Sequence, residues 1–160
     1  MDFDTLWKVL QTALPLRIRN KKALGVFASN RAKFEGWLKV EVIDILLERG
    51  VAVPEKERID IVFEDCAIEL KTVNTNYKVK EVLDKTKPVT KNIREILKDI
   101  NKLKNSAFRL KTVLFVVFPL DKEVKWKKHI AKIEDVVEKI ESVDFVFYNN
   151  IPGKIYFGKI

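Results

Sequence analysis

Two carboxylates and an ammonium group interrupt an otherwise apolar stretch of the sequence, RIDIVFEDCAIELKT. Asp60 lies near its start, and Glu69 and Lys71 follow nine and eleven residues later. Carboxylates that face each other across neighbouring strands are destabilising and resist double ionisation. A divalent cation removes both problems, and Mg²⁺ is commonly held by one or two carboxylates together with substrate phosphates. Because a lysine beside such an ion can position a water or stabilise a reacting phosphate, these residues predict phosphodiester hydrolysis.

A β-hairpin is the element that must bring these side chains together. The apolar runs predict two strands joined by a two-residue turn at Glu64 and Asp65, which pairs Phe63 with Cys66. A three-residue loop would change this register, and an edge hairpin with its charges pointing to water is the alternative. Alternation along the strands then divides the residues between two faces: Asp60, Val62, Glu69 and Lys71 on one, and Ile59, Ile61, Phe63, Ile68 and Leu70 on the other.

A helix over residues 30–49 precedes this hairpin in the sequence. Asn30 is an acceptable N-cap and Gly50 a good C-terminal stop. Apolar residues recur at helical spacing along one side, which predicts a buried stripe. That stripe consists of Phe34, Leu38, Val42 and Ile45.

The remaining elements predict one α/β domain over residues 1–160, with a mixed central sheet flanked by helices. Pro15 is expected to end the first helix. The other predicted helices and strands follow from helical spacing, alternation and an apolar run that suits a strand covered on both faces. The helices span 3–13, about 90–105 and 123–141; the strands span 51–53, 112–118, 143–149 and 154–160; loops span 16–30 and 74–88.

With these elements around it, the motif resembles the PD-(D/E)XK, or restriction-endonuclease-like, nuclease superfamily. The matching residues are Asp60 and the tripeptide Glu69-Leu70-Lys71. The element order over about residues 30–118 also matches the αβββαβ core of that superfamily, here with an added N-terminal helix and a C-terminal helix plus hairpin. Archaeal Holliday junction resolvases and many restriction endonucleases share this layout. Ile59 stands where the superfamily often has proline, which is a common departure.

This resemblance implies an endonuclease that depends on Mg²⁺ or Mn²⁺. Asp60 and Glu69, with the backbone carbonyl of Leu70, would hold the metal, and Lys71 would lie at the nucleophilic water. The superfamily also uses a glutamate from the preceding helix, for which Glu35 and Glu41 both qualify; we favour Glu35. Family precedent favours DNA over RNA. A non-catalytic nucleic-acid-binding module on the same fold is the alternative, and a homodimer or a partner subunit stays open.

The charge of the chain favours a polyanionic partner. Its 160 residues carry a net charge of +8, as expected of a protein that binds nucleic acid. Charged residues make up 34% of the chain and Gln11 is the only glutamine, a bias typical of proteins from hot environments, so a lysine-rich surface is the alternative. The candidates for phosphate contacts are a helical ridge, Lys91, Arg94, Lys98 and Lys102, and a loop cluster, Arg17, Arg19, Lys21 and Lys22.

The sequence also supports expectations about the location of the protein and about its cysteine, histidine and one tryptophan. No apolar run approaches the roughly 18 residues of a membrane helix, and the first residues lack a secretion-signal pattern. The single cysteine, Cys66, cannot form an internal disulfide, so we expect a cytoplasmic protein. His129 has no second histidine or nearby cysteine for a zinc site and is expected to be exposed, whereas Trp126 is expected to be packed.

Overall fold

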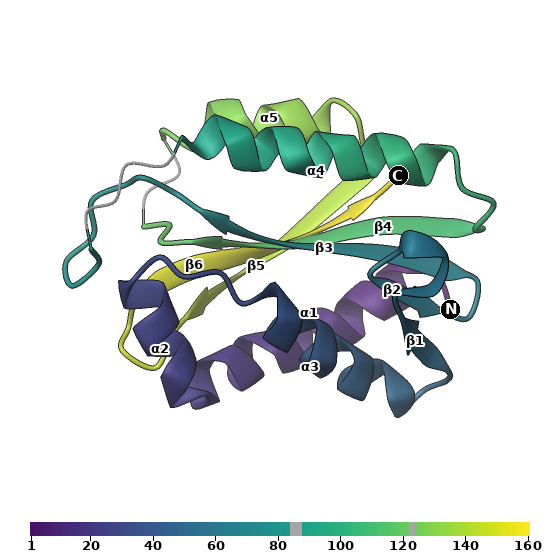
Figure 1. Cartoon of the computed structure of the whole chain (residues 1–160), viewed down its shortest axis with the longest axis horizontal. Helices are drawn as coiled ribbons and strands as arrows, with labels where there is room; N and C mark the ends of the chain where they lie inside the picture. Colours follow the sequence, from purple (N-terminus) through teal and green to yellow (C-terminus); the bar gives the residue numbers. More distant parts are fainter. Residues whose placement is uncertain (84–87, 122–123) are drawn as a thin grey trace.

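Six strands form one mixed sheet in the computed structural model of the chain, which describes residues 1–83, 88–121 and 124–160 (Figure 1). The strand order across the sheet is β1-β2-β3-β4-β6-β5. β3 and β4 are parallel, and every other pair of neighbours is antiparallel. The strands are β1 (Ala52–Pro54), β2 (Ile61–Phe63), β3 (Cys66–Asn74), β4 (Leu110–Phe118), β5 (Lys139–Val146) and β6 (Pro152–Lys159).

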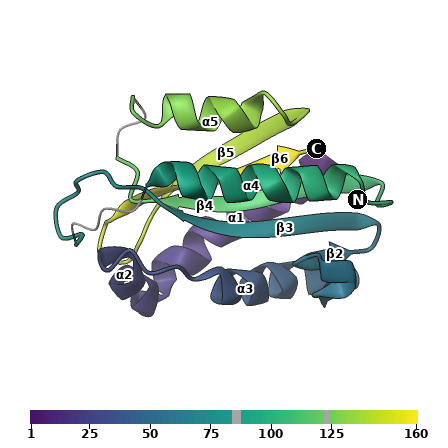
Figure 2. The same cartoon turned by 45° about the horizontal axis from the view of Figure 1, so that its top comes forward.

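Helices cover both faces of the sheet, as predicted. On one face lie α1 (Phe3–Asn20), α2 (Lys22–Ser29) and α3 (Glu35–Leu47); on the other lie α4 (Val89–Lys104) and α5 (Lys127–Glu134) (Figure 1). Figure 2 shows α4 running along β3 and β4. A short 3-10 turn, η1 (Lys56–Arg58), joins β1 to β2. The elements from α3 to β4 therefore follow one another in the expected order of helix, three strands, helix and strand.

The apolar run in β4 explains why the sheet is covered on both sides. Leu114, Val116 and Phe118 pack into the core beneath α1 and α3. The alternate residues, such as Phe115, pack into the core beneath α4 and α5. The predicted stripe of α3 is buried as well, since Leu38 and Val42 are fully inaccessible to solvent. Two hydrophobic layers thus hold β3 and β4 at the centre of the sheet, and the candidate site lies on the edge of β3 beside β2.

The first helix is longer than predicted, because Pro15 does not end it. α1 continues through Pro15 to Asn20. A proline inside a helix removes one backbone hydrogen bond, but Leu10, Leu14 and Ile18 recur at helical spacing and are all fully buried. Their burial offsets the lost bond.

The predicted loop over residues 16–30 is also wrong. It contains the end of α1 and the whole of α2. The next helix, α3, begins at Glu35 rather than near Asn30, and Asn30 instead caps the C-terminus of α2. The predicted loop over residues 74–88 begins one residue too early, since Asn74 still belongs to β3; its residues 84–87 lie outside the described part of the chain.

The helix predicted over residues 123–141 is wrong at its C-terminal end. α5 ends at Glu134, and the chain then enters β5 at Lys139. β5 pairs along its whole length with β6. The closing hairpin is therefore confirmed, but its first strand begins four residues earlier than the alternation at 143–149 indicated.

The register of the central hairpin is confirmed, while the faces predicted for Ile59 and Asp60 are not. Phe63 pairs with Cys66 and Ile61 with Ile68, as a two-residue turn requires. Ile59, however, packs on the α4 side with Leu103, opposite to the predicted face. The reason is the turn before β2, where Glu55, Glu57 and Arg58 have φ values of 56°, 55° and 63°. Left-handed residues break the alternation of side chains that a continuous strand would impose.

The extension of α1 beyond Pro15 predicts a sharp difference between two substitutions. Ile18→Ala should lower the free energy of unfolding by about 2–5 kcal/mol, because it leaves a cavity in the core. Leu16→Ala on the same turn should change it by less than about 0.5 kcal/mol, since Leu16 is 60% exposed. Guanidinium denaturation of both variants checks this, and equal costs would contradict a helix that continues past the proline.

Candidate active site

The site is built on the edge of β3 that β2 leaves uncovered. β2 has three residues and β3 has nine, and their pairing ends at Ile61 and Ile68. The backbone amides beyond that point need other acceptors. Asp60 Oδ2 accepts from the Leu70 amide at 2.9 Å, and Glu35 Oε1 accepts from the Thr72 amide at 3.0 Å. Carboxylates from two separate elements thus continue the hydrogen bonding of β3 where the neighbouring strand stops.

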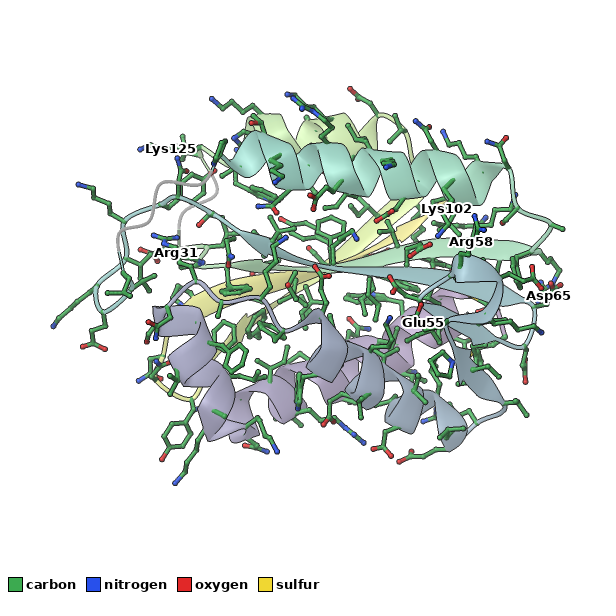
Figure 3. The ribbon with its side chains drawn as sticks, viewed as in Figure 1. Arg31, Glu55, Arg58, Asp65, Lys102 and Lys125 are labelled. Atoms are coloured by element: carbon green, nitrogen blue, oxygen red, sulfur yellow. The ribbon has the colours of Figure 1, made fainter. Side chains whose placement is uncertain are left out.

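Glu69 and Lys71 project from β3 toward α4. The apolar residues between and beside them, Ile68 and Leu70, face the opposite core. Lys102 Nζ of α4 lies 2.5 Å from Glu69 Oε1 and also donates to the carbonyl of Arg58. In Figure 3, Lys102 lies beside Arg58 at one end of the molecule. Alternation along β3 is therefore confirmed for both residues.

Asp60 and Glu69 form a close carboxyl pair that shares a hydrogen bond. Glu69 is 4% exposed. Burial, together with the neighbouring Asp60, raises the pKa of Glu69 to about 7, although Lys102 acts in the opposite direction. Burial would also raise the pKa of Asp60, but the hydrogen bonds from Glu69, Lys39 and the Leu70 amide outweigh it and lower that pKa. Below the pKa of Glu69, about 7, the pair therefore carries a single negative charge on Asp60, and above it Glu69 is ionised as well.

Two lysines balance this pair from opposite helical layers. Lys39 of α3 lies 2.7 Å from Asp60 Oδ1 and also pairs with Glu55. Burial alone would lower the pKa of Lys39, but Asp60 and Glu55 raise it above its usual value. Lys102 meets Glu69 from the other side, and its side chain is 43% exposed. The carboxyl pair is thus neutralised by one half-buried and one exposed ammonium group.

Lys71 has its own partner on α4. Its Nζ lies 3.2 Å from Asp99 Oδ2. Burial would lower the pKa of Lys71, but Asp99, with smaller contributions from Glu35 and Asp60, raises it. Burial raises the pKa of Asp99 against the pull of Lys71. The pair holds a charged ammonium group on the same strand as Glu69, two residues further along.

The structure separates the two glutamates that the sequence left open. Glu35, at the start of α3, reaches the edge of β3 through Thr72. Glu41 lies 2.7 Å from Arg17 of α1, on the far side of α3 from this edge. The four predicted residues Asp60, Glu69, Lys71 and Glu35 therefore surround one edge of β3, and Glu41 does not join them. The site spans that edge rather than one face of the sheet.

Lys39 and Asp99 were missed by the sequence analysis. Lys39 follows Glu35 by one helical turn, which is the spacing that places two side chains on the same side of a helix. Asp99 lies between Ile96 and Leu103 on the buried side of α4. An acid within a buried stripe is a signal for a buried ion pair, but its partner could be found only from the tertiary structure.

The two predicted basic clusters differ in which of their residues are exposed. Lys91, Arg94 and Lys98 of the predicted ridge are exposed along α4, whereas Lys102 is turned toward Glu69. The second cluster lies on α1 and α2 and not on a loop. Its Arg17 contacts Glu41 and Asp44 of α3, at 2.7 and 2.5 Å. The other members, Arg19, Lys21 and Lys22, are exposed.

The donor set of this site suits a cation with few protein ligands. Asp60 and Glu69 supply two carboxyl groups, and the backbone of Leu70 faces the same edge through its amide. Among the described residues, no group of three or more acids, histidines or cysteines is placed to hold a metal ion. One or two carboxylates with water and substrate phosphates are the usual ligands of Mg²⁺, so the pair fits that ion and not a site built of protein ligands alone.

His129 lies elsewhere in the fold and is not exposed, contrary to the sequence prediction. It is 9% exposed and its ring lies 5.9 Å from the ring of Trp126. Trp126 is packed as predicted, and its Nε1 donates to Tyr156 Oη at 2.8 Å. Cys66 is buried, and this burial raises the pKa of its thiol to about 12.

Comparison with known proteins gives no relative to set beside this geometry. No protein-family model, curated protein or solved structure matches the chain. In the part of the chain that the structure describes, none of the helices combines the length and apolar character that crossing a membrane requires.

The raised pKa of Glu69 predicts a stability that falls as the pH rises. In an unfolded chain glutamate titrates near 4.3, so between that pH and about 7 the folded protein keeps a proton that the unfolded chain releases. The resulting stabilisation is complete below about pH 4 and is lost as the pH rises through about 7. Glu69→Gln should remove this dependence and raise the free energy of unfolding at about pH 8 by on the order of 1–2 kcal/mol.

Denaturation across this pH range measures the effect. Glu41→Gln is the matched control, because Glu41 lies on α3 against Arg17 and should leave the pH dependence of the unchanged chain intact. A Glu69→Gln protein that is less stable than the unchanged chain at about pH 8 would show that the ionised carboxylate stabilises the fold, which contradicts a raised pKa of Glu69.

Proposed function

We propose that this protein is a metal-dependent nuclease that hydrolyses phosphodiester bonds, with DNA favoured over RNA. The observation that carries the proposal is the buried carboxyl pair of Asp60 and Glu69, with Lys71 on the same strand as Glu69. The order of elements from α3 to β4 supports a restriction-endonuclease-like core around it. A carboxyl pair and a lysine in such a core are the parts that phosphodiester hydrolysis requires.

Mg²⁺ or Mn²⁺ is the proposed cofactor, held by Asp60, Glu69 and the carbonyl of Leu70. Bound there, the ion would lower the pKa of a water and neutralise charge on the phosphate. Lys102 must release Glu69 for this, and because its side chain is 43% exposed it can turn toward solvent or a phosphate. The positive charge that stabilises the site in its present form is thus exchangeable.

The surrounding residues have distinct parts in this proposal. The Leu70 amide and Lys39 fix the orientation of Asp60. Lys71, kept charged by Asp99, would stabilise negative charge on the attacked phosphate. Glu69 must lose its proton to bind the metal, and its pKa of about 7 allows this near neutral pH.

A non-catalytic nucleic-acid-binding module is the second candidate. One observation favours it: each charged group at the centre has a partner, with Asp60 on Lys39, Glu69 on Lys102, and Lys71 on Asp99. Such a network is also what a purely structural role would produce. This candidate predicts salt-dependent binding without cleavage, so one set of assays separates the two.

The test is incubation with supercoiled, linear, single-stranded and branched DNA, with Mg²⁺ or Mn²⁺ against EDTA. We expect cleavage that needs the metal. Asp60→Asn keeps an oxygen to accept from the Leu70 amide but loses the charge, and should reduce cleavage by about two orders of magnitude or more while DNA binding persists. Cleavage rates and filter-binding affinities of the same samples measure both effects.

The two glutamates of α3 that the sequence analysis considered provide a test and its control. Glu35→Gln, beside β3, should lower cleavage, whereas Glu41→Gln, against Arg17, should leave it unchanged. Full cleavage activity of Asp60→Asn would contradict the nuclease assignment. DNA binding without cleavage by the unchanged protein would instead support the non-catalytic binding module.

The exposed face of α4 predicts how DNA binding responds to salt. Lys91→Ala combined with Lys98→Ala should reduce the slope of log affinity against log salt by up to about 1.8, since each lost phosphate contact removes about 0.9. Arg19→Ala combined with Lys22→Ala, on the opposite helical layer, is the control and should keep the original slope. If the control variant alone flattens the slope, DNA binds to the α1–α2 side.

A further inference from the structure

A cavity of about 780 Å³ lies at the other end of β3 from the carboxyl pair. Its walls come from the segment after β3, the segment after β4, and the first turn of α5. These are the carboxyl ends of two parallel strands, where α/β proteins commonly bind small molecules. In Figure 3, Lys125 of this region and Lys102 of the candidate active site lie at opposite ends of the molecule. Glu69 and the end of β3 at Asn74 are separated by five residues of strand, roughly 16 Å.

Positive charge converges on this cavity from separate parts of the chain. Lys78 comes from the segment after β3, Lys125 from the segment after β4, and Lys128 from α5, while Asp121 is the one acid among the described residues of the lining. The N-terminal end of α5, at Lys127, lies beside them. Lysines and a helix N-terminus together favour an anion.

Two polar atoms in the lining residues are buried without a hydrogen-bond partner. These are Nδ1 of His129 and the hydroxyl of Tyr77, both among the described residues that form the cavity wall. Burial, with Lys128 and Lys132 nearby, lowers the pKa of His129, so its ring is neutral near pH 7 and offers one donor and one acceptor. Buried polar groups are rarely left unbonded in folded proteins. Both atoms are closed off from solvent, so a ligand with several oxygens would bond them once the two side chains turn toward the cavity.

The wall of the cavity is held in place by a buried arginine. Arg31, 7% exposed, donates from its guanidinium group to the carbonyls of Thr75, Tyr77 and Leu83. The Thr75 amide in turn donates to the carbonyl of Phe118 at 3.1 Å, which ties the segments after β3 and β4 together. The backbone on this side of the cavity is therefore held in place, while the lysine side chains around it are exposed.

We propose that this cavity binds a phosphate monoester of mononucleotide size. Its volume lies within the range of about 300–1,000 Å³ that is usual for sites of small ligands. The lysines and the end of α5 would hold the phosphate, and Tyr77 and His129 would bond its oxygens or the sugar. Val79 and Val124 supply an apolar wall for a base. The proposal does not depend on the nuclease assignment, because it uses none of the same residues.

His129 gives the experiment an unambiguous probe, because it is the only histidine in the chain. Its ring signals are followed by NMR in EDTA during titration with AMP, inorganic phosphate, adenosine and a 5′-phosphorylated oligonucleotide. We expect AMP and phosphate to shift the ring signals and adenosine to leave them unchanged. Lys128→Ala should weaken the binding of AMP about fivefold. Lys127→Ala, a neighbour outside the cavity lining, should change the affinity for AMP by less than about twofold.

Each other outcome overturns the proposal. Signals that do not move with AMP or phosphate would leave the cavity without an anion site. Equal weakening by both lysine variants would indicate diffuse charge attraction, and a response to the oligonucleotide alone would assign the cavity to a strand instead of a free nucleotide. Because the titration needs neither metal nor cleavage, its failure leaves the nuclease proposal untouched.

Discussion

The mismatch in length between β2 and β3 is the constraint on which the rest of the site depends. Three residues cannot pair with nine, so the amides of Leu70 and Thr72 require acceptors from outside the sheet. Asp60 and Glu35 supply them. Carboxylates drawn to a half-buried edge must in turn be balanced by cations, which accounts for Lys39. A deficit in backbone hydrogen bonding thereby gathers the ionisable groups into one place.

The same arrangement links the two helical layers. Lys39 comes from α3 on one side of the sheet, and Lys102 and Asp99 come from α4 on the other. Asp60 and Glu69 lie between them at the edge of β3. A change in charge at the carboxyl pair, whether by a proton or by a cation, therefore alters ion pairs with helices on both faces of the sheet. Metal binding and stability should for this reason be measured together.

The sequence predicted what alternation and turn length determine. The pairing of Phe63 with Cys66, and the side on which Glu69 lies, follow from a two-residue turn and the two-residue period of a strand. The position of Asp60 at the edge does not, because the left-handed residues before it break that period. Asp99 and Lys39 have local signals, but their partners are set by packing between helices. The strand at Lys139 was mistaken for helix because its pairing with β6 overrides a local pattern.

The two edge strands of the sheet, β1 and β5, carry features that oppose pairing with the sheet of another copy of the chain. β1 has three residues and ends in Pro54, which has no amide hydrogen to offer a neighbour. β5 exposes charged side chains, among them Lys139 and Asp144. Short, proline-containing or charged borders are devices by which natural sheets resist lateral growth. Pairing between the sheets of two copies is therefore disfavoured at both of these strands.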